Sequence, residues 1–160
     1  MNKHFNKFSA SQKGFTVIEL IVVITIIAIL SAVILLSVTQ YINKGKDSNI
    51  SGNLAVLVPA GEVYYNIENA AYGDGYTGFC DPDKNSAIKN AISQMPQNPT
   101  GDCLGGLTPG LCCNVAPDGD SWAACAQEFT YNTQAYCVDS RGVKKEILNS
   151  SCTSAIVSCD

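Results

Sequence analysis

Charged residues are scarce in this sequence of 160 residues, and histidine is nearly absent. Aspartate, glutamate, lysine and arginine make up 15% of the chain, against about 25% in an average globular domain. Because His4 is the single histidine, no Ser-His-Asp or Cys-His set can be assembled, and no paired carboxylates stand out either. We therefore predict that the protein is not an enzyme and needs no cofactor or metal.

The shortage of charge is local. Between residues 15 and 41 the run FTVIELIVVITIIAILSAVILLSVTQY contains one formally charged side chain, Glu19. As a helix this run would extend about 40 Å, which exceeds the hydrocarbon core of a bilayer at about 30 Å. A secretory signal has a shorter apolar core and a small-x-small cleavage site. The run therefore predicts a membrane-spanning helix and excludes an ordinary cytosolic enzyme.

Acidic residues are missing from the first fourteen positions, which carry Lys3, Lys7 and Lys13. This positive flank predicts that the amino terminus lies on the cytoplasmic side of the membrane. The whole chain has a net charge of −4, and without this segment 7 bases would face 14 acids, a net charge of −7. Such an acidic chain has no broad basic surface, so DNA binding is not predicted from charge.

Cysteine is absent before residue 80, and the remainder contains eight, without any Cys-x-x-Cys pair: Cys80, Cys103, Cys112, Cys113, Cys125, Cys137, Cys152 and Cys159. An even number confined to one part of a chain predicts disulfides and an oxidising compartment. Eight cysteines allow 105 connectivities. We expect only that the adjacent Cys112 and Cys113 have different partners, and that Cys137 bonds to Cys152 or Cys159.

Beyond residue 41 a helical stripe of apolar and small residues continues the apolar run at spacings of three and four: Ile50, Leu54, Leu57, Gly61, Tyr64 and Tyr65. This periodicity predicts an amphipathic helix over residues 42–72. It should have a kink or loosened turn near Pro59 and end within residues 69–75, where glycine is concentrated.

The remaining residues predict a small domain. Residues 86–95 favour a short helix with Ser86 as a possible cap, and the Gly/Pro-rich residues 97–120 favour a loop. SWAACAQEF, YNTQAYCVDS and KKEILNS read as three strands, the last two joined at Ser140-Arg141-Gly142. The expected fold is α+β: a long amino-terminal helix packed on a small antiparallel β-sheet with disulfide-linked loops.

Two acidic segments have the beginnings of a calcium loop. Asp81, Asp83 and Asn85 alternate, but the central Gly and the closing Glu are missing, and Asp118 and Asp120 have no defined third ligand. We predict solvated turns at both places. The aromatic residues of the strands are expected in the core rather than in a ligand site: Trp122, Tyr131 and Tyr136.

The residues KGFTVIEL, from Lys13 to Leu20, combine a basic residue, a glycine and an acid within an apolar helix. A carboxylate at membrane depth is costly and needs a partner. If the chain were cut after Gly14, the new α-amine of Phe15 would lie about one helical turn from Glu19, in the same chain or in a neighbour. This arrangement predicts pairing between the two groups.

At these residues the sequence resembles the type IV pilin superfamily, the pilins and pseudopilins with a type III signal. The resemblance implies that a prepilin peptidase cleaves after Gly14 and methylates the Phe15 amine, and that Glu19 then contacts Phe15 of an adjacent subunit. It divides the chain into a leader (1–14), a transmembrane and assembly helix (15–41), its amphipathic continuation (42–72) and a cysteine-rich pilin domain (73–160). Many members have a helix-breaking proline within the apolar helix, whereas residues 33–38 here are VILLSV.

The function implied by the resemblance is structural: a subunit of a type IV pilus or related filament. Its partners would be the peptidase, other copies of itself and related pilins, an assembly platform with an ATPase motor acting indirectly, and inner-membrane lipid before assembly. The precursor would cross the inner membrane once, and the assembled filament would be periplasmic or extracellular.

Two alternatives stay open. The chain could be a pseudopilin of type II secretion or competence, which differs from a pilin in filament length. It could also be a monomeric, membrane-anchored, disulfide-rich binding domain, for which the leader would not be removed at Gly14.

Overall fold

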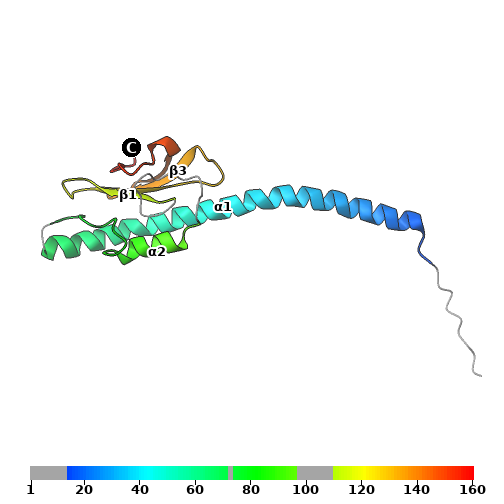
Figure 1. Ribbon diagram of the computed structural model, residues 1–160, viewed down its shortest axis with the longest axis horizontal. Helices are drawn as coiled ribbons and strands as arrows, with labels where there is room; N and C mark the ends of the chain where they lie inside the picture. The colour runs from blue at the N-terminus through cyan, green and yellow to red at the C-terminus, as the bar shows by residue number, and fades with distance from the viewer. Residues whose placement is uncertain (1–13, 72–73, 97–109) are drawn as a thin grey trace, which may run out of the picture. The chain divides into compact units, whose positions relative to one another are not determined.

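The computed structural model describes residues 14–71, 74–96 and 110–160 (Figure 1). The chain divides between Thr39 and Gln40 into two compact units. One helix, α1 (Val17–Ala71), runs from the first unit into the second. The second unit adds the short helix α2 and four strands.

Helix α1 is 55 residues long and ends inside the predicted interval. It stays α-helical across residues 33–38, where many type IV pilins have a proline. It is also α-helical on both sides of Pro59, the position at which the sequence predicts a kink or a loosened turn. An interior proline costs a helix about 3 kcal/mol relative to alanine. Since most helix stability in proteins comes from tertiary packing, the buried Leu54 and Leu57 beside Pro59 offset this cost.

The predicted stripe on α1 is the face that packs in the core. Ile50, Leu54 and Leu57 are buried, and Tyr64 and Tyr65 pack half-buried against the same cluster. This cluster also contains Phe79 and Trp122, whose rings lie 4.5 Å apart between centroids. Burial of each large aliphatic side chain contributes about 1.5–3 kcal/mol, so this face holds the helix to the rest of the unit.

Helix α2 (Ser86–Gln94) is confirmed, but its cap is not the expected residue. The N-cap is Asn85, whose side chain accepts a hydrogen bond from the backbone N of Ala87 at 2.9 Å. Ser86 is the first helical residue. Asn and Ser are similarly favoured as N-caps, so their order alone could not decide between them. Ile88 and Ala91 are buried on the inner face of α2.

The sheet consists of β1 (Cys112–Val115), β2 (Trp122–Gln127), β3 (Gln134–Asp139) and β4 (Lys144–Leu148), in that spatial order, with every neighbouring pair antiparallel. A short 3₁₀ helix (Asn149–Ser151) follows. The last three strands confirm the prediction, as does the α+β class. The expectation of irregular structure throughout residues 97–120 is wrong at β1, and residues 97–109 lie outside the described residues.

The two faces of the sheet are covered by different parts of the chain. Trp122, Ala124 and Val138 belong to the cluster that includes the α1 residues. The opposite face contributes Ala123, Cys125 and Cys137 to a second cluster that includes residues of the carboxy-terminal segment. Strand β2 is therefore buried along its whole length, because it is covered on both faces.

Disulfides connect the sheet to its surroundings. Cys80 bonds to Cys113 of β1, Cys125 of β2 to Cys152, and Cys137 of β3 to Cys159. Cys112 is disulfide-bonded too, and Cys103 lies outside the described residues. The expectation for Cys137 is confirmed at Cys159, and Cys112 and Cys113 do not bond to each other. A disulfide stabilises a fold by about 2–4 kcal/mol, which matters for a domain of this size.

Asp139 organises the turn between β3 and β4. Only 1% of its surface is exposed, and its carboxylate accepts hydrogen bonds from Arg141, from the backbone N of Val143 and from the backbone N of Cys159. Burial alone would raise the pKa of Asp139, but the hydrogen bonds from Arg141, Cys159 and Val143 outweigh it and lower the pKa. One carboxylate thus fastens both the turn and the carboxy-terminal segment.

Helix α1 approaches the sheet most closely at Gly61. A Cβ atom on Gly61 would lie 2.7 Å from Nε1 of Trp122, and the Trp122 side chain is buried and has no room to move away. We expect Gly61→Ala to destabilise the domain by about 1–3 kcal/mol, as overpacking does. The midpoint of thermal unfolding, followed by fluorescence of Trp122, the single tryptophan of the chain, measures the effect.

Gly52 provides the matched control, since it lies in the same helix and a Cβ there meets nothing within 4 Å. Gly52→Ala should raise stability by up to about 1 kcal/mol through helix propensity alone. An equal response of the two variants would contradict the packing role of Gly61.

Asp139 leads to a prediction about acid stability. A carboxylate with a lowered pKa stabilises the fold above its unfolded pKa of about 3.9, and this contribution is lost as the pH falls through the folded value. We expect the wild-type domain to lose stability below about pH 4 and Asp139→Asn to lose about 2–3 kcal/mol at pH 7, measured by chemical denaturation across pH. Asp160→Asn, at an exposed partner of Arg141, should have a much smaller effect.

Candidate processing and assembly site

The start of α1 is fixed by hydrogen bonds between Thr16 and Glu19. The backbone N and the Oγ1 of Thr16 each donate to Oε2 of Glu19 at 2.8 Å, and the backbone N of Glu19 donates to Oγ1 of Thr16 at 3.3 Å. This reciprocal arrangement is a capping box, which satisfies backbone N–H groups that a helix start otherwise leaves unpaired. The Thr-x-x-Glu spacing is visible in the sequence, but the prediction for Glu19 rests on its charge and does not include this cap.

The capping box gives Glu19 a partner within its own chain. A negative charge in the first turn is also favourable because it faces the positive end of the helix dipole. Both hydrogen bonds from Thr16 end on the same oxygen, Oε2. Among the described residues, no donor contacts the other oxygen, Oε1, which is available to a group from outside the chain.

Gly14 and Phe15 precede the helix and are accessible. Gly14 lies outside regular structure, and the space around its Cα is open to 4 Å. Phe15 is 82% exposed. Together with Ile18, Glu19, Val22 and Val23, Phe15 lines a shallow groove of about 330 Å³. The peptide bond between Gly14 and Phe15 is therefore open to a protease, and the residue after it borders an apolar surface.

Large apolar side chains remain exposed along the first half of α1. Phe15, Val17, Ile18 and Leu20 begin a series that continues to Ile42. In the described part of the chain, α1 is the one helix with the length and composition to cross a membrane. By the hydrophobic effect this surface requires lipid or protein around it.

The other candidates from the sequence have local structural roles. Asp81 accepts a hydrogen bond from the backbone N of Asp83, and Asp118 accepts one from the backbone N of Asp120, as in ordinary turns. Trp122 is buried and Tyr136 half-buried, as expected. Tyr131 is exposed instead, so its predicted place in the core is wrong. It lies in the connection between β2 and β3 rather than inside a strand.

Three cysteine sulfurs of the described residues come within 4.8 Å of one another, those of Cys112, Cys125 and Cys152. Metal coordination requires thiolates. Cys125 and Cys152 form a disulfide with each other, and Cys112 is disulfide-bonded as well. This cluster is therefore a site of crosslinking rather than of metal binding.

Comparison with known proteins identifies the amino-terminal segment. Residues 9–35 match the family model of the prokaryotic N-terminal methylation motif. The type IV major alpha-pilin of Moraxella bovis is 51% identical over 45 residues, and fimbrial protein Q of the same organism is 49% identical over 45 residues. No solved structure matches the chain significantly.

These matches cover 28% of this chain and 28–29% of each relative. Within that part, the predicted resemblance to type IV pilins is confirmed: the chain has the methylation motif of these proteins, and this motif includes the beginning of a long apolar helix. The cysteine-rich remainder lies outside the matched residues, so its properties depend on the structure alone.

Proposed function

We propose that this chain is a structural subunit of a type IV pilus or a related filament, made as a precursor, cut after Gly14 and polymerised through α1. The observation that carries the proposal is the position of the methylation motif. It spans residues 9–35, which include both the accessible Gly14–Phe15 bond and the first part of α1, where the apolar side chains are exposed.

The uncovered surface supports a role in assembly. A large aliphatic side chain gains about 1.5–3 kcal/mol when it moves from water to an apolar environment, so α1 cannot remain in water as a monomer. Lipid satisfies this requirement before assembly, and the α1 helices of neighbouring subunits satisfy it afterwards. Contacts of this kind between different faces of identical subunits do not close on themselves and so produce a fibre.

The apolar surface of α1 also continues beyond the first unit, on the side of the helix away from the core. Val56, Val63 and Ile67 are exposed there and, with Pro59 and Ala60, border a groove of about 520 Å³. These positions recur at helical spacings, so they form one stripe. The stripe gives a neighbouring apolar helix a surface to pack on without disturbing the domain's own core.

Glu19 would select the register between subunits. After cleavage the Phe15 amine is a cation, and a carboxylate in an apolar environment favours a partner of opposite charge. Oε1 of Glu19, which no donor of the described residues contacts, can accept a hydrogen bond from the Phe15 amine of an adjacent subunit while Oε2 keeps its contacts with Thr16. Pairing in this way would neutralise both charges inside the filament.

The proposed partners and locations follow from this route. A prepilin peptidase in the inner membrane would remove residues 1–14 on the cytoplasmic side and methylate Phe15. An assembly platform driven by an ATPase motor would then extract the subunit from lipid into a filament made of copies of this chain and related pilins. The cysteine-rich domain would be outside the cytoplasm, where disulfides form.

Processing can be tested by coexpressing the chain with a prepilin peptidase and determining the mature amino terminus by mass spectrometry. We expect a product that begins at N-methylated Phe15. Gly14→Val, which places a branched side chain at the cleavage site, should leave the precursor intact. A full-length product in the presence of active peptidase would instead favour a monomeric anchored domain.

The role of Glu19 can be separated from its role in the capping box. Glu19→Gln removes the charge but keeps an amide oxygen able to accept from Thr16, since glutamine also occurs at this position of capping boxes. We expect Glu19→Gln and Glu19→Ala both to be cleaved at Gly14 and both to form few or no filaments, counted by electron microscopy. Wild-type filament numbers from Glu19→Gln would refute the charge pairing.

A further inference from the structure

A cavity of about 330 Å³ lies in the second unit, between α1 and the end of the sheet where β2 passes into β3. Three carboxylates line it: Asp47 from α1, Glu128 from the segment after β2, and Glu146 from β4. The one base among its lining residues is Lys44. The formal charge of the lining is therefore −2, in a cavity that none of the predicted functions uses.

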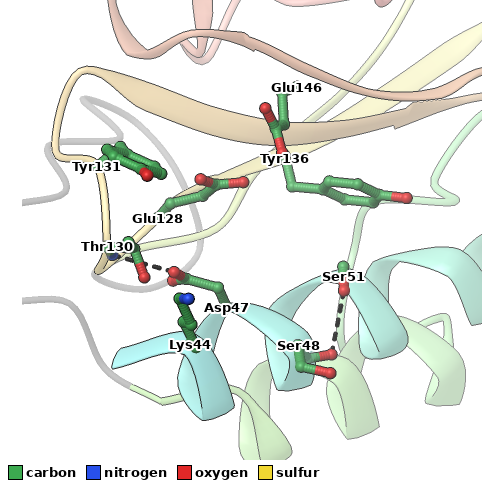
Figure 2. A pocket seen from close by; sticks show the side chains of 9 residues that line it. All are labelled: Lys44, Asp47, Ser48, Ser51, Glu128, Thr130, Tyr131, Tyr136 and Glu146. Atoms are coloured by element: carbon green, nitrogen blue, oxygen red, sulfur yellow. Dashed lines mark hydrogen bonds between the residues drawn. The ribbon is translucent and has the colours of Figure 1, made fainter. Parts of the chain in front are cut away.

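Figure 2 shows how these groups lie. The Glu128 side chain extends between those of Tyr131 and Tyr136, with Glu146 on one side and Asp47 on the other. Asp47 is already engaged, because its two oxygens accept hydrogen bonds from the backbone N of Phe129 at 2.6 Å and of Thr130 at 3.0 Å. Asp47 thus holds the connection between β2 and β3 against α1 and shapes one wall.

Glu128 is the unsatisfied group in the cavity. Only 7% of its surface is exposed, and no donor among the described residues contacts its carboxylate. Burial raises the pKa of Glu128, and the nearby Glu146 and Asp47 raise it further. The described residues form two ion pairs, and both involve Arg141 at the other end of β3. Neither of them includes Glu128. A buried carboxylate without a partner is costly.

One fully buried atom beside the cavity is also without a partner among the described residues. Oγ1 of Thr130 is fully buried and makes no hydrogen bond among the described residues, and Thr130 lines the same cavity. Its hydroxyl can accept a hydrogen bond from a ligand that donates. Glu128 therefore favours a positively charged ligand with N–H donors, and the hydroxyl of Thr130 can accept from such a donor.

The spacing of the carboxylates decides between a metal ion and a larger cation. Calcium requires oxygen ligands at about 2.3–2.6 Å from one centre, so three carboxylates that bind it lie close together. Among the described residues, the one group of three possible metal ligands whose atoms all lie within 4.8 Å of one another consists of cysteines. The carboxylate oxygens of Asp47, Glu128 and Glu146 therefore do not come that close together. A compact ion cannot contact all three in this arrangement.

The aromatic walls favour an organic cation. Tyr131 and Tyr136 border the cavity, and a tyrosine ring attracts an ammonium or guanidinium group placed over its face. A guanidinium has N–H donors pointing in several directions and can therefore bridge carboxylates too far apart to share a metal ion. Tyr131 lines the cavity and is also exposed, so an alkyl stem can extend past it into solvent.

We propose that this cavity is a binding site for an alkylguanidinium or alkylammonium group, in which Glu128 pairs with the cation and Tyr131 and Tyr136 flank it. Such a group is carried by arginine and lysine side chains of another polypeptide and by free diamines. The proposal concerns the folded domain and holds whether or not the chain is processed and assembled as proposed above.

The test is an NMR titration of the full chain in detergent micelles, following the backbone amides of residues 128–131. N-acetyl-arginine amide and N-acetyl-lysine amide represent side chains of a polypeptide, and putrescine represents a free diamine. N-acetyl-citrulline amide is the neutral control of nearly the same shape as the arginine derivative. We expect saturable shifts with at least one cation and affinity for citrulline that is weaker by about tenfold or more.

Variants assign the effect to the cavity. Glu128→Gln keeps the shape of the side chain and should weaken cation binding about tenfold or more while raising the unfolding temperature of the ligand-free protein, because a buried charge is removed. Glu146→Gln, at an exposed position, should weaken binding without a change in folding. Asp83→Asn, an exposed carboxylate outside the cavity, should bind as the wild type does.

The outcomes separate the sources of the cation and the alternatives. Tighter binding of the capped amino acids indicates a protein partner, and tighter binding of putrescine indicates a free amine. Equal binding of citrulline, no response of residues 128–131 to any cation, or shifts there with calcium chloride but not with the organic cations would overturn the proposal.

Discussion

Helix α1 has more apolar surface than the described part of the chain covers, and the rest of the second unit depends on the face of this helix that is covered. From residue 50 onward one face packs against the sheet, where Gly61 allows the backbone to lie close to Trp122. Before residue 43 the apolar side chains around the helix are exposed, and nothing in the described part of the chain buries them. One continuous helix therefore has a carboxy-terminal half that packs in a folded core and an amino-terminal half whose side chains suit lipid or other helices.

The sheet has a comparable division between its two faces. One face receives α1, and this contact consists of apolar packing together with the hydrogen bonds of Asp47. The other face receives the carboxy-terminal segment, which is held by the Cys125–Cys152 and Cys137–Cys159 disulfides and by Asp139. The contact with the helix thus depends on apolar packing and on Asp47, whereas two disulfides hold the segment on the opposite face; the Cys80–Cys113 disulfide lies on the same side as the helix. This suits a domain too small to obtain its stability from one extensive core.

Sequence reasoning succeeded where a single periodicity determines the structure. The stripe from Ile50 to Tyr65 and the three later strands follow from spacings of 3.6 and 2 residues. The methylation motif over residues 9–35 was also readable from the sequence, while cleavage after Gly14 stays a prediction. Sequence reasoning failed at β1, whose flanking glycines and prolines suggest a loop. It also failed at the cap of α2, where Asn85 and Ser86 are equally good candidates. Disulfide partners need three-dimensional proximity, so Cys80–Cys113 could not be chosen among the many possible pairings.

The cavity around Glu128 could not have been predicted from the sequence, because Asp47, Glu128 and Glu146 are far apart in the chain and none belongs to a motif. The capping box is different, since Thr16 and Glu19 have the required spacing. It was missed because the acid in the apolar run has a second interpretation as a charge awaiting a partner. Both interpretations are compatible, since the two carboxylate oxygens can serve different donors.

The placement of the cysteines has a mechanical consequence. Every cysteine follows residue 79, so no disulfide ties α1 to the domain that it supports. Tension applied along a helix would reach the domain through the apolar face from Ile50 to Tyr65, through the hydrogen bonds of Asp47, and through the chain that continues after Ala71. Non-covalent contacts of this kind resist load less than sulfur–sulfur bonds do. Under traction, the helix would therefore slide along the sheet before the crosslinked domain itself extended.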